Sequence, residues 1–461
     1  MDIKLHKNVL FDAWIIIMDI LIVLISAFLS YKFISLWKPV EPIGKVPMLF
    51  SIGCTIFMLY TYDFYTKMIR RKYEIILSII ITVVVTTIVM IITNFLFLHK
   101  SLRIESAYFG VMPFFLLVFL TFWKSILLKI VKRVEGVSKL LIIESKDVSN
   151  TLARKVKYSY LELYESWYVE IDVNDCDEIA ETIAKFDDYE SVFISPDIPD
   201  SVRAVFISEA VSKRKEIYIL PDLYNISVMK NETVHFEDTP ALRIKPFGLT
   251  TMQKVIKRAM DIVVSVIGIV VTSPVMLISA IAIKIDSDGP VIYKQERLTY
   301  DEKPFMVYKF RTMFKDAEIK TGATLATDND PRVTKVGRVL RSLRIDELPQ
   351  FFNIFMGSMS VVGPRPERPV FVKQFKAEIP NYDKRFHAKA GLTGFAQVYA
   401  RYDTTAKDKT LYDLLYIKDY SFWFDIKLLL LTIKIIFMKE SSDGVGSRPD
   451  YTNIDSKGSE E

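Results

Sequence analysis

Four long apolar stretches occupy the first 123 residues of the chain, and they constrain its fold more than any other feature. The stretches 46–62, 75–98 and 106–123 contain no charged side chain, and the first stretch, 9–36, is interrupted only by Asp12, Asp19 and Lys32. Since a helix needs about 20 apolar residues to cross a bilayer, we predict four transmembrane helices. The first stretch is too long for a cleaved signal peptide and further runs follow it at once.

The distribution of basic residues indicates how this bundle is oriented. They cluster in the loop after the second stretch and at the end of the fourth, namely Lys67, Arg70, Arg71, Lys72, Lys124, Lys129, Lys132 and Arg133. By the positive-inside rule, both ends of the bundle face the cytoplasm. Asp12 and Asp19 lie seven residues apart on one helical face. We place Asp12 at the membrane interface and expect Asp19 to face a neighbouring helix.

A fifth apolar run, 262–283, contains Ser273 and Pro274 near its middle. Basic residues flank it on both sides, namely Lys254, Lys257, Arg258, Lys284, Lys294 and Arg297. A proline inside a helix removes one backbone hydrogen bond, so a bend is expected here. Two interpretations of the run stay open: a broken helix that enters and leaves one leaflet, and a kinked fifth span.

The segment between the fourth and fifth apolar runs has the pattern of a soluble α/β domain. Strand-like runs alternate with helical ones, and the strands are expected at 140–143, 166–171, 191–195 and 216–220. This order predicts βαβ units with a parallel sheet. A dinucleotide site would need glycines directly after the first strand, but the sequence there is Glu144-Ser145-Lys146-Asp147. We therefore predict a Rossmann-like domain that binds no dinucleotide and serves in scaffolding or regulation.

Basic residues recur in the last third of the chain with the spacing of regular structure. Two alternate with aromatic residues in a strand-like segment and three recur at every third residue of a helical one: Lys309, Arg311, Arg338, Arg341 and Arg344. Each set would therefore share one face of its element. Such residues are ordinarily solvated surface charges. Their convergence on one acidic motif favours a site.

That motif is Asp346-Glu347-Leu348-Pro349-Gln350. Asp346 suits the N-cap of a helix that continues through apolar residues to Gly357. A helix start favours ionised carboxylates and suits phosphate binding. An ionised aspartate can attack phosphorus to form an acyl phosphate, and a neighbouring glutamate can ligate Mg²⁺. An acidic pair at a helix start is, by itself, more often only a cap.

The motif is followed by a proline-rich loop, Gly363-Pro364-Arg365-Pro366-Glu367-Arg368-Pro369. Arg365 stands between two prolines, so it loses little entropy when it binds a phosphate through two hydrogen bonds. The segment 420–438 fits an interfacial helix as well as a core helix. The polar tail 439–461 is predicted to be disordered.

Composition argues against two other classes of protein: nucleic-acid binders, and chains held together by a disulfide framework or a zinc site. Lys and Arg number 60 against 55 Asp and Glu, so the chain lacks the dense basic surface of a nucleic-acid binder. Its two cysteines, Cys54 and Cys176, have no metal-ligand spacing.

Several long motifs follow one another in a fixed order between about residue 255 and residue 438: KRAMD, YKFRTM, IDELPQFFN, GSMSVVGPRP, KAGLTGFAQV and DLLYIKDYSFWFDIKLLLLT. They resemble the bacterial sugar transferases, which are monotopic phosphoglycosyl transferases, or polyprenol-phosphate hexose-1-phosphate transferases. The preceding membrane helices and the degenerate nucleotide-binding-like domain resemble the large members of that family. Those members initiate exopolysaccharide, capsule or O-antigen synthesis.

The resemblance implies transfer of a sugar-1-phosphate from a UDP-sugar, such as UDP-glucose or UDP-galactose, to undecaprenyl phosphate with release of UMP. The reaction would take place on the cytoplasmic face of the bacterial membrane. In the family the aspartate matched by Asp346 is the nucleophile and forms a phosphosugar intermediate, and the glutamate matched by Glu347 supports Mg²⁺ binding. The arginine matched by Arg365 is associated with the nucleotide phosphates. The Ser-Pro break, here Ser273-Pro274, turns the re-entrant helix.

Together these observations predict a membrane protein with α and α/β parts. We expect four transmembrane helices in 1–136, the Rossmann-like cytoplasmic domain in 137–248, and a mainly α monotopic catalytic domain in 249–438 with a re-entrant helix at 262–283. The expected catalytic and metal-binding residues are Asp346 and Glu347. The expected substrate-binding residues are Lys309, Arg311, Arg341, Arg365 and Arg368.

Two rival functions share some of these features. The first is a non-catalytic membrane scaffold of a polysaccharide assembly complex. The second is a membrane-anchored nucleotide-sugar dehydratase, which would need the missing glycine-rich turn. The sequence identifies neither the sugar nor the oligomeric state. A homo-oligomer and contacts with downstream glycosyltransferases and regulators are compatible with it.

Overall fold

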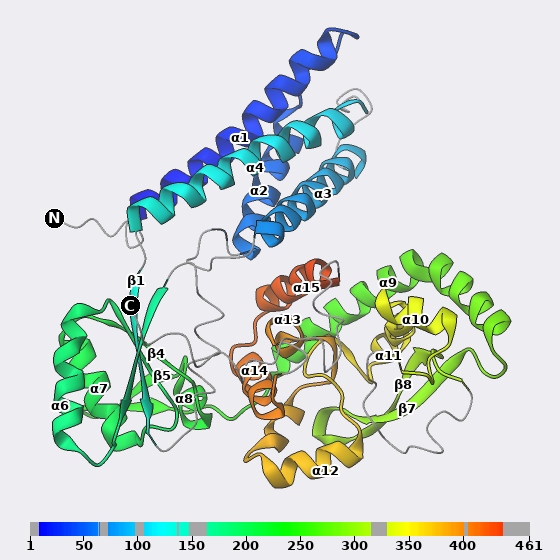
Figure 1. The fold of residues 1–461 in the computed structure, drawn as a ribbon. Coiled ribbons are helices and arrows are strands. Elements are labelled where there is room, and N and C mark those ends of the chain that lie inside the picture. Colours follow the sequence, from blue (N-terminus) through cyan, green and yellow to red (C-terminus); the bar gives the residue numbers. More distant parts are fainter. Residues whose placement is uncertain are drawn as a thin grey trace. The chain divides into compact units, whose positions relative to one another are not determined.

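The computed structural model describes residues 9–62, 64, 72–96, 106–135, 138–146, 164–314, 330–400 and 404–436. The chain divides into two compact units, Met1–Leu220 and Pro221–Glu461, each of which is described by itself (Figure 1). The expected domain boundary at residue 248 therefore falls inside the second unit. The predicted tail 439–461 and the loop cations Lys67, Arg70 and Arg71 lie outside the described residues.

The first unit begins with the four predicted apolar helices, α1 (Val9–Ser35), α2 (Lys45–Thr61), α3 (Lys72–Leu96) and α4 (Tyr108–Glu135). Helices α1, α3 and α4 are long and apolar enough to cross a membrane. Helix α2 has 17 residues, or about 26 Å of length, which is close to the hydrocarbon thickness of a bilayer. The fourth helix that is long enough is α9, in the second unit.

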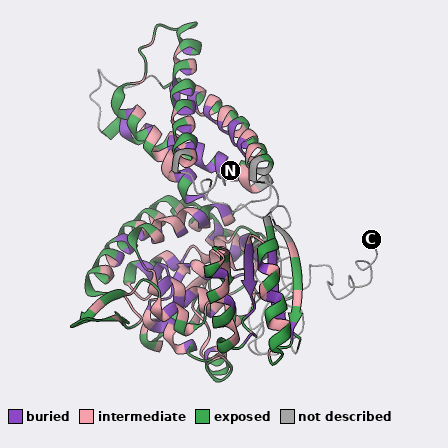
Figure 2. Ribbon diagram, turned by 90° about the vertical axis from the view of Figure 1, so that its left-hand side faces the viewer, coloured by how far each residue is buried: buried purple, intermediate pink, exposed green. Residues whose placement is uncertain are grey.

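Buried positions alternate with exposed ones along the helices of this bundle (Figure 2), and its interior holds polar side chains beside an apolar core while many large apolar side chains lie outside. Ser26, Ser30 and Thr55 are buried, and each hydroxyl donates a hydrogen bond to a backbone carbonyl one turn earlier. Phe28 and Phe122 are more than half exposed. Because the interior holds small hydroxyl side chains and the outside is apolar, the bundle suits a lipid environment.

One ion pair joins the first and last helices of the bundle. The Asp19 carboxylate accepts hydrogen bonds from Lys124 Nζ at 2.7 Å and from Trp123 Nε1 at 3.0 Å. Both charged side chains are buried, with 1% of Lys124 and none of Asp19 exposed. The expectation that Asp19 faces a neighbouring helix is thereby confirmed.

We expect Asp19→Ala to lower the free energy of unfolding in detergent by about 3–5 kcal/mol, because it leaves a buried ammonium without its counter-charge. The double variant Asp19→Ala/Lys124→Met should recover part of this loss, since both charges are then removed. Asp12→Ala, at a half-buried position of the same helix, is the matched control. Equal losses for Asp12→Ala and Asp19→Ala would contradict the structural role of the pair.

The rest of the first unit contains a four-stranded parallel sheet in the order β2-β1-β3-β4. Its elements are β1 (Ser138–Ser145), β2 (Tyr164–Ile171), α6 (Cys176–Ala184), η3 (Lys185–Asp188), β3 (Ser191–Ile194), α7 (Asp200–Ser212) and β4 (Glu216–Ile219). Leu141 and Ile143 belong to one buried cluster, whereas Leu140 and Ile142 belong to another. This alternation shows that both faces of the sheet are covered, and the parallel pairing agrees with the βαβ order predicted from the sequence.

A side-chain carboxylate lies at the carboxyl end of β1. The Ser145 backbone N–H donates to the Asp197 carboxylate at 2.8 Å. In dinucleotide-binding folds, backbone N–H groups at this end of the first strand face a phosphate. Here the Ser145 N–H already donates to a side-chain carboxylate instead.

The second unit carries the remaining elements. Its helices are α8 (Leu223–Val228), α9 (Thr251–Asp286), α10 (Lys335–Ser342), α11 (Gln350–Met356), α12 (Pro369–Glu378), α13 (Phe395–Tyr399), α14 (Ala406–Lys418) and α15 (Phe422–Ile436), with 3-10 turns η4 (Tyr300–Glu302), η5 (Ile345–Glu347) and η6 (Tyr382–His387). Its strands pair as β5 (Glu232–Phe236) with β6 (Thr239–Arg243), β7 (Ile292–Leu298) with β8 (Pro304–Phe310), and β9 (Ser360–Val362) with β10 (Gly391–Thr393).

Helix α9 contains the fifth apolar run. It begins at a capping box formed by Thr250 and Gln253 and extends over 36 residues, about 54 Å of helix. Pro274 lies inside it, and Figure 1 shows that the helix changes direction along its length. Val270 and Val271, just before the proline, are about two-thirds exposed at 66% and 68%. The middle of α9 is therefore an apolar surface that the rest of the described chain leaves uncovered.

Both ends of α9 are anchored on the same unit. Near the amino end, Asp261 accepts hydrogen bonds from Ser360 Oγ at 2.8 Å and from the Val361 N–H at 2.9 Å. Near the carboxyl end, Ile283 packs in a buried cluster with Phe310 and Leu340. The chain thus leaves the body of the second unit and returns to it within one helix.

Candidate active site

The acidic motif forms a separate short turn, and this corrects the expected helix start. Asp346 and Glu347 lie in η5, whereas α11 begins at Gln350 with Pro349 as its N-cap. The Phe351 N–H donates to the Leu348 carbonyl and the Phe352 N–H donates to the Pro349 carbonyl, so the bonds at this point join residues three apart and the α-helical pattern does not extend back over the two acidic residues. Arg344, with a left-handed φ of 55°, ends the preceding segment. It therefore does not share the face of α10, which ends at Ser342.

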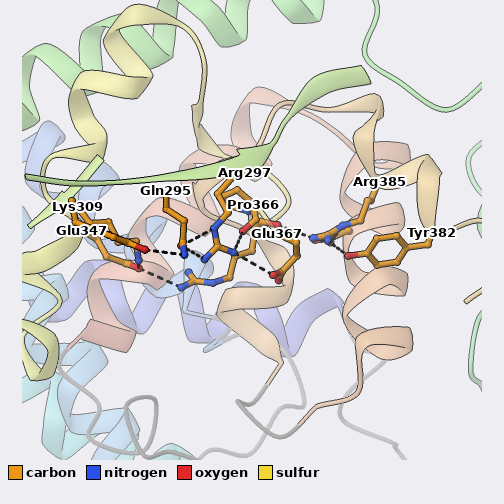
Figure 3. Close-up of polar contacts among 11 residues, drawn as sticks. Gln295, Arg297, Lys309, Glu347, Pro366, Glu367, Tyr382 and Arg385 are labelled. Atoms are coloured by element: carbon orange, nitrogen blue, oxygen red, sulfur yellow. Dashed lines mark hydrogen bonds and ion pairs between the residues drawn. The ribbon is translucent and has the colours of Figure 1, made fainter. Parts of the chain in front are cut away.

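Two cations hold Glu347. Its Oε1 accepts from Lys309 Nζ at 2.7 Å and from Arg365 Nη2 at 3.3 Å (Figure 3). Burial by itself would raise the pKa of Glu347, but the charges of Lys309 and Arg365 outweigh it and hold that pKa well below its usual range. Glu347 is therefore a fixed anion. Its two partners come from different elements, Lys309 from strand β8 and Arg365 from the proline-rich loop.

Asp346 has the opposite electrostatic setting. Within the described part of the chain, no side chain makes a hydrogen bond or ion pair with its carboxylate, which is half-buried. Burial raises the pKa of Asp346 and the adjacent charge of Glu347 raises it further, while Lys309, Arg341 and Arg365 act in the other direction. One carboxylate of the pair is thus anchored and the other is available. Perturbed groups of this kind are characteristic of reactive sites.

The structure brings three of the five expected substrate-binding residues around the pair. Lys309 and Arg365 contact Glu347, and the charge of Arg341 acts on Asp346 while its Nε donates to Thr312 Oγ1 at 2.8 Å. The other two have different structural positions. Arg311 Nη2 donates to the Ser287 carbonyl at 2.6 Å, at the C-cap of α9, and Arg368 is the N-cap of α12.

Sequence reasoning gave no role to Asn353, which joins α11 to β8. Its Oδ1 accepts from the Tyr308 N–H at 2.9 Å and its Nδ2 donates to the Met306 carbonyl at 2.7 Å. Asn353 is 2% exposed. The only available signal was a polar residue within an apolar helical run. Asn353 fixes the strand that carries Lys309 next to the turn that carries Glu347.

The acidic pair fits a divalent cation only together with substrate oxygens. Among the residues that the structure describes, no group of three or more His, Cys, Asp or Glu could hold a metal by itself. Mg²⁺ commonly binds through one or two carboxylates plus substrate phosphates. Burial raises the pKa of Asp346 and the charge of Glu347 raises it further; a dication would offset this second, like-charge effect.

Comparison with known proteins identifies the family. Residues 252–439 match the model of the bacterial sugar transferases. Over 191 residues, 40% of this chain and 71% of the relative, the chain is 37% identical to the UDP-glucose:undecaprenyl-phosphate glucose-1-phosphate transferase of Caulobacter vibrioides. The chain belongs to the bacterial sugar transferase family.

Two further relatives carry different sugar names. The UDP-N-acetylgalactosamine-undecaprenyl-phosphate N-acetylgalactosaminephosphotransferase of Aeromonas hydrophila is 48% identical over 184 residues, 39% of this chain and 43% of that protein. The UDP-glucose:undecaprenyl-phosphate glucose-1-phosphate transferase of Escherichia coli is 36% identical over 256 residues, 54% of this chain and 55% of that protein. The chain thus spans about half the length of these curated relatives.

We expect Asn353→Ala to lower the free energy of unfolding by about 1–3 kcal/mol, because it leaves a partly buried backbone N–H and carbonyl of β8 without their side-chain partner. Denaturant titration of the purified protein in detergent measures this loss. Gln374→Ala is the control, since that exposed amide donates one hydrogen bond, to the Glu378 side chain one turn away, and it should change stability by less than about 0.5 kcal/mol. Equal effects of the two substitutions would contradict the role of Asn353.

Proposed function

We propose that this protein transfers a sugar-1-phosphate from a UDP-sugar to undecaprenyl phosphate in a bacterial cytoplasmic membrane and releases UMP. The observation that carries the proposal is the division of roles in the acidic pair: Glu347 is anchored by two cations, whereas Asp346 is free to react. Membership of the sugar transferase family supports the same reaction class. The relatives' names include both glucose and N-acetylgalactosamine, so the sugar is a question for experiment.

The chemistry would proceed in two displacements at one phosphorus. The Asp346 carboxylate attacks the β-phosphorus of the UDP-sugar, the bond to the bridging oxygen breaks, and UMP leaves. The sugar phosphate is then held as an acyl phosphate on Asp346. An oxygen of undecaprenyl phosphate attacks the same phosphorus and frees the carboxylate. The negative charge that develops during the two displacements would be stabilised by three nearby basic residues, Lys309, Arg341 and Arg365.

UMP release from a panel of UDP-sugars, with undecaprenyl phosphate present, tests this function. The wild-type protein should release UMP with at least one sugar, and Asp346→Asn should abolish release while the protein stays folded, because the amide is not a nucleophile. Asp383→Asn is the matched control, since this carboxylate pairs only with Lys384 at the surface. If no UDP-sugar yields UMP, the non-catalytic scaffold becomes the better account.

We further propose that Mg²⁺ binds at the acidic pair, with Glu347 and Asp346 as its protein ligands. When bound, the ion would offset the negative charge of the substrate pyrophosphate. An excess of chelator should abolish UMP release and added Mg²⁺ should restore it. Glu347→Gln should raise the Mg²⁺ concentration needed for half-maximal release. Full activity in excess chelator would contradict the proposal.

Helix α9 is proposed to be re-entrant, with both ends on the cytoplasmic side. Its exposed apolar middle, the internal Pro274 and the anchoring of both ends on one unit support this topology. In a variant whose native cysteines are replaced by serine, a cysteine at Lys294 should resist membrane-impermeant labelling from the periplasm. A cysteine at Lys38, in the first predicted periplasmic loop, is the positive control. Strong labelling at 294 would indicate a true fifth span.

A further inference from the structure

A buried arginine lies behind the proline-rich loop and holds its backbone. Arg385 Nη2 donates to the main-chain carbonyl oxygen of Arg365 at 2.9 Å (Figure 3). The Arg365 side chain extends the other way, to Glu347. The residue that reaches the acidic pair is therefore held from behind by a second guanidinium.

Arg385 is itself fixed in place. Its Nη2 and Nε lie 2.7 Å and 3.0 Å from Asp413 Oδ2, and its Nη1 donates to the Tyr382 hydroxyl. The Arg385 and Asp413 side chains are 6% and 2% exposed. A buried ion pair of this kind is often no more stabilising than apolar residues of similar volume. Its presence here therefore points to a role besides stability, and the bond to the Arg365 carbonyl identifies one.

The next two carbonyls of the loop are held from another element. Arg297 Nη1, on β7, donates to the Pro366 carbonyl at 3.2 Å, and the Leu298 N–H donates to the Glu367 carbonyl at 3.2 Å. Three successive carbonyls, of residues 365 to 367, thus accept hydrogen bonds from elements outside the loop. The main chain at Arg365 is fixed, and only its side chain is left to respond to a ligand.

We propose that Arg385, charge-paired with Asp413, is a positioning residue that acts through the Arg365 main chain to aim the Arg365 guanidinium at the phosphate of the bound nucleotide. This inference rests on the proposed function, since it takes Arg365 to be a nucleotide contact. Because the effect passes through Arg365, substitution of Arg385 should matter only while Arg365 is an arginine.

A double-mutant cycle on nucleotide binding tests this dependence. UMP affinity of the full-length protein in detergent is measured for wild type, Arg385→Met, Arg365→Met and the double variant. Arg385→Met should weaken UMP binding about tenfold, the loss expected when a hydrogen-bonded charged contact is misplaced. In the Arg365→Met background the same substitution should weaken binding less than about twofold. Equal weakening in both backgrounds would overturn the proposal.

Two further variants separate positioning from loss of fold. Asp413→Asn keeps Arg385 and the shape of the site but removes the counter-charge, and should weaken UMP binding with the same dependence on Arg365. Asp425→Asn disrupts another buried pair of this unit, Lys257–Asp425 at 2.7 Å. It should lower the unfolding temperature without weakening UMP binding. If Asp425→Asn weakens UMP binding as much as Asp413→Asn does, Arg385 is a general stabilising residue and has no positioning role.

The proposed function can fail separately. A wild-type protein that neither binds UMP nor releases it from any UDP-sugar overturns the function, and the positioning role falls with it. A wild type that releases UMP, with Arg385→Met binding UMP as tightly as wild type, overturns the positioning role alone.

Discussion

Two adjacent carboxylates, those of Asp346 and Glu347, lie in one short turn. The surrounding parts of the second unit give them different partners and different electrostatic settings. Without cations, neighbouring negative charges in a half-buried turn would favour protonation of one of them. Lys309 and Arg365 supply those cations from two different parts of the chain, and both contact Glu347. Glu347 is thereby held as an anion, and beside it lies the Asp346 carboxylate, which no side chain of the described residues pairs with.

Each cation depends on a second layer of contacts. Lys309 is placed by β8, and β8 is joined to α11 by the side chain of Asn353. Arg365 is placed by a loop whose carbonyls bond Arg385 and Arg297. The amino-terminal half of α9 is joined to β9, just before this loop, through Asp261. The site is thus tied to α9, the helix whose apolar middle is exposed.

Patterned features were predictable from the sequence. The alternation of strand-like and helical runs predicted the parallel sheet. The cost of a charge inside the membrane predicted that Asp19 faces another helix. The sequence also predicted that three basic residues lie near the acidic pair, namely Lys309, Arg341 and Arg365, because they stand in motifs close to that pair along the chain. The predicted helix start at Asp346 was wrong, because the left-handed Arg344 and the 3-10 hydrogen bonds that follow it place the acidic pair in a separate short turn before α11. The bonds of Asn353 and Arg385 to distant backbone atoms leave no periodic signal, so sequence reasoning could not find them.

The central claim is that Asp346 carries the sugar phosphate, and mass analysis tests it most directly. The protein is incubated with a UDP-sugar that yields UMP, without lipid acceptor, and its intact mass is measured before peptide mapping. The account predicts an adduct of one hexose phosphate, on the peptide that contains Asp346, which disappears when undecaprenyl phosphate is added. Asp346→Asn should show no adduct. An adduct that maps to Glu347, or turnover by Asp346→Asn near the wild-type rate, would contradict the account.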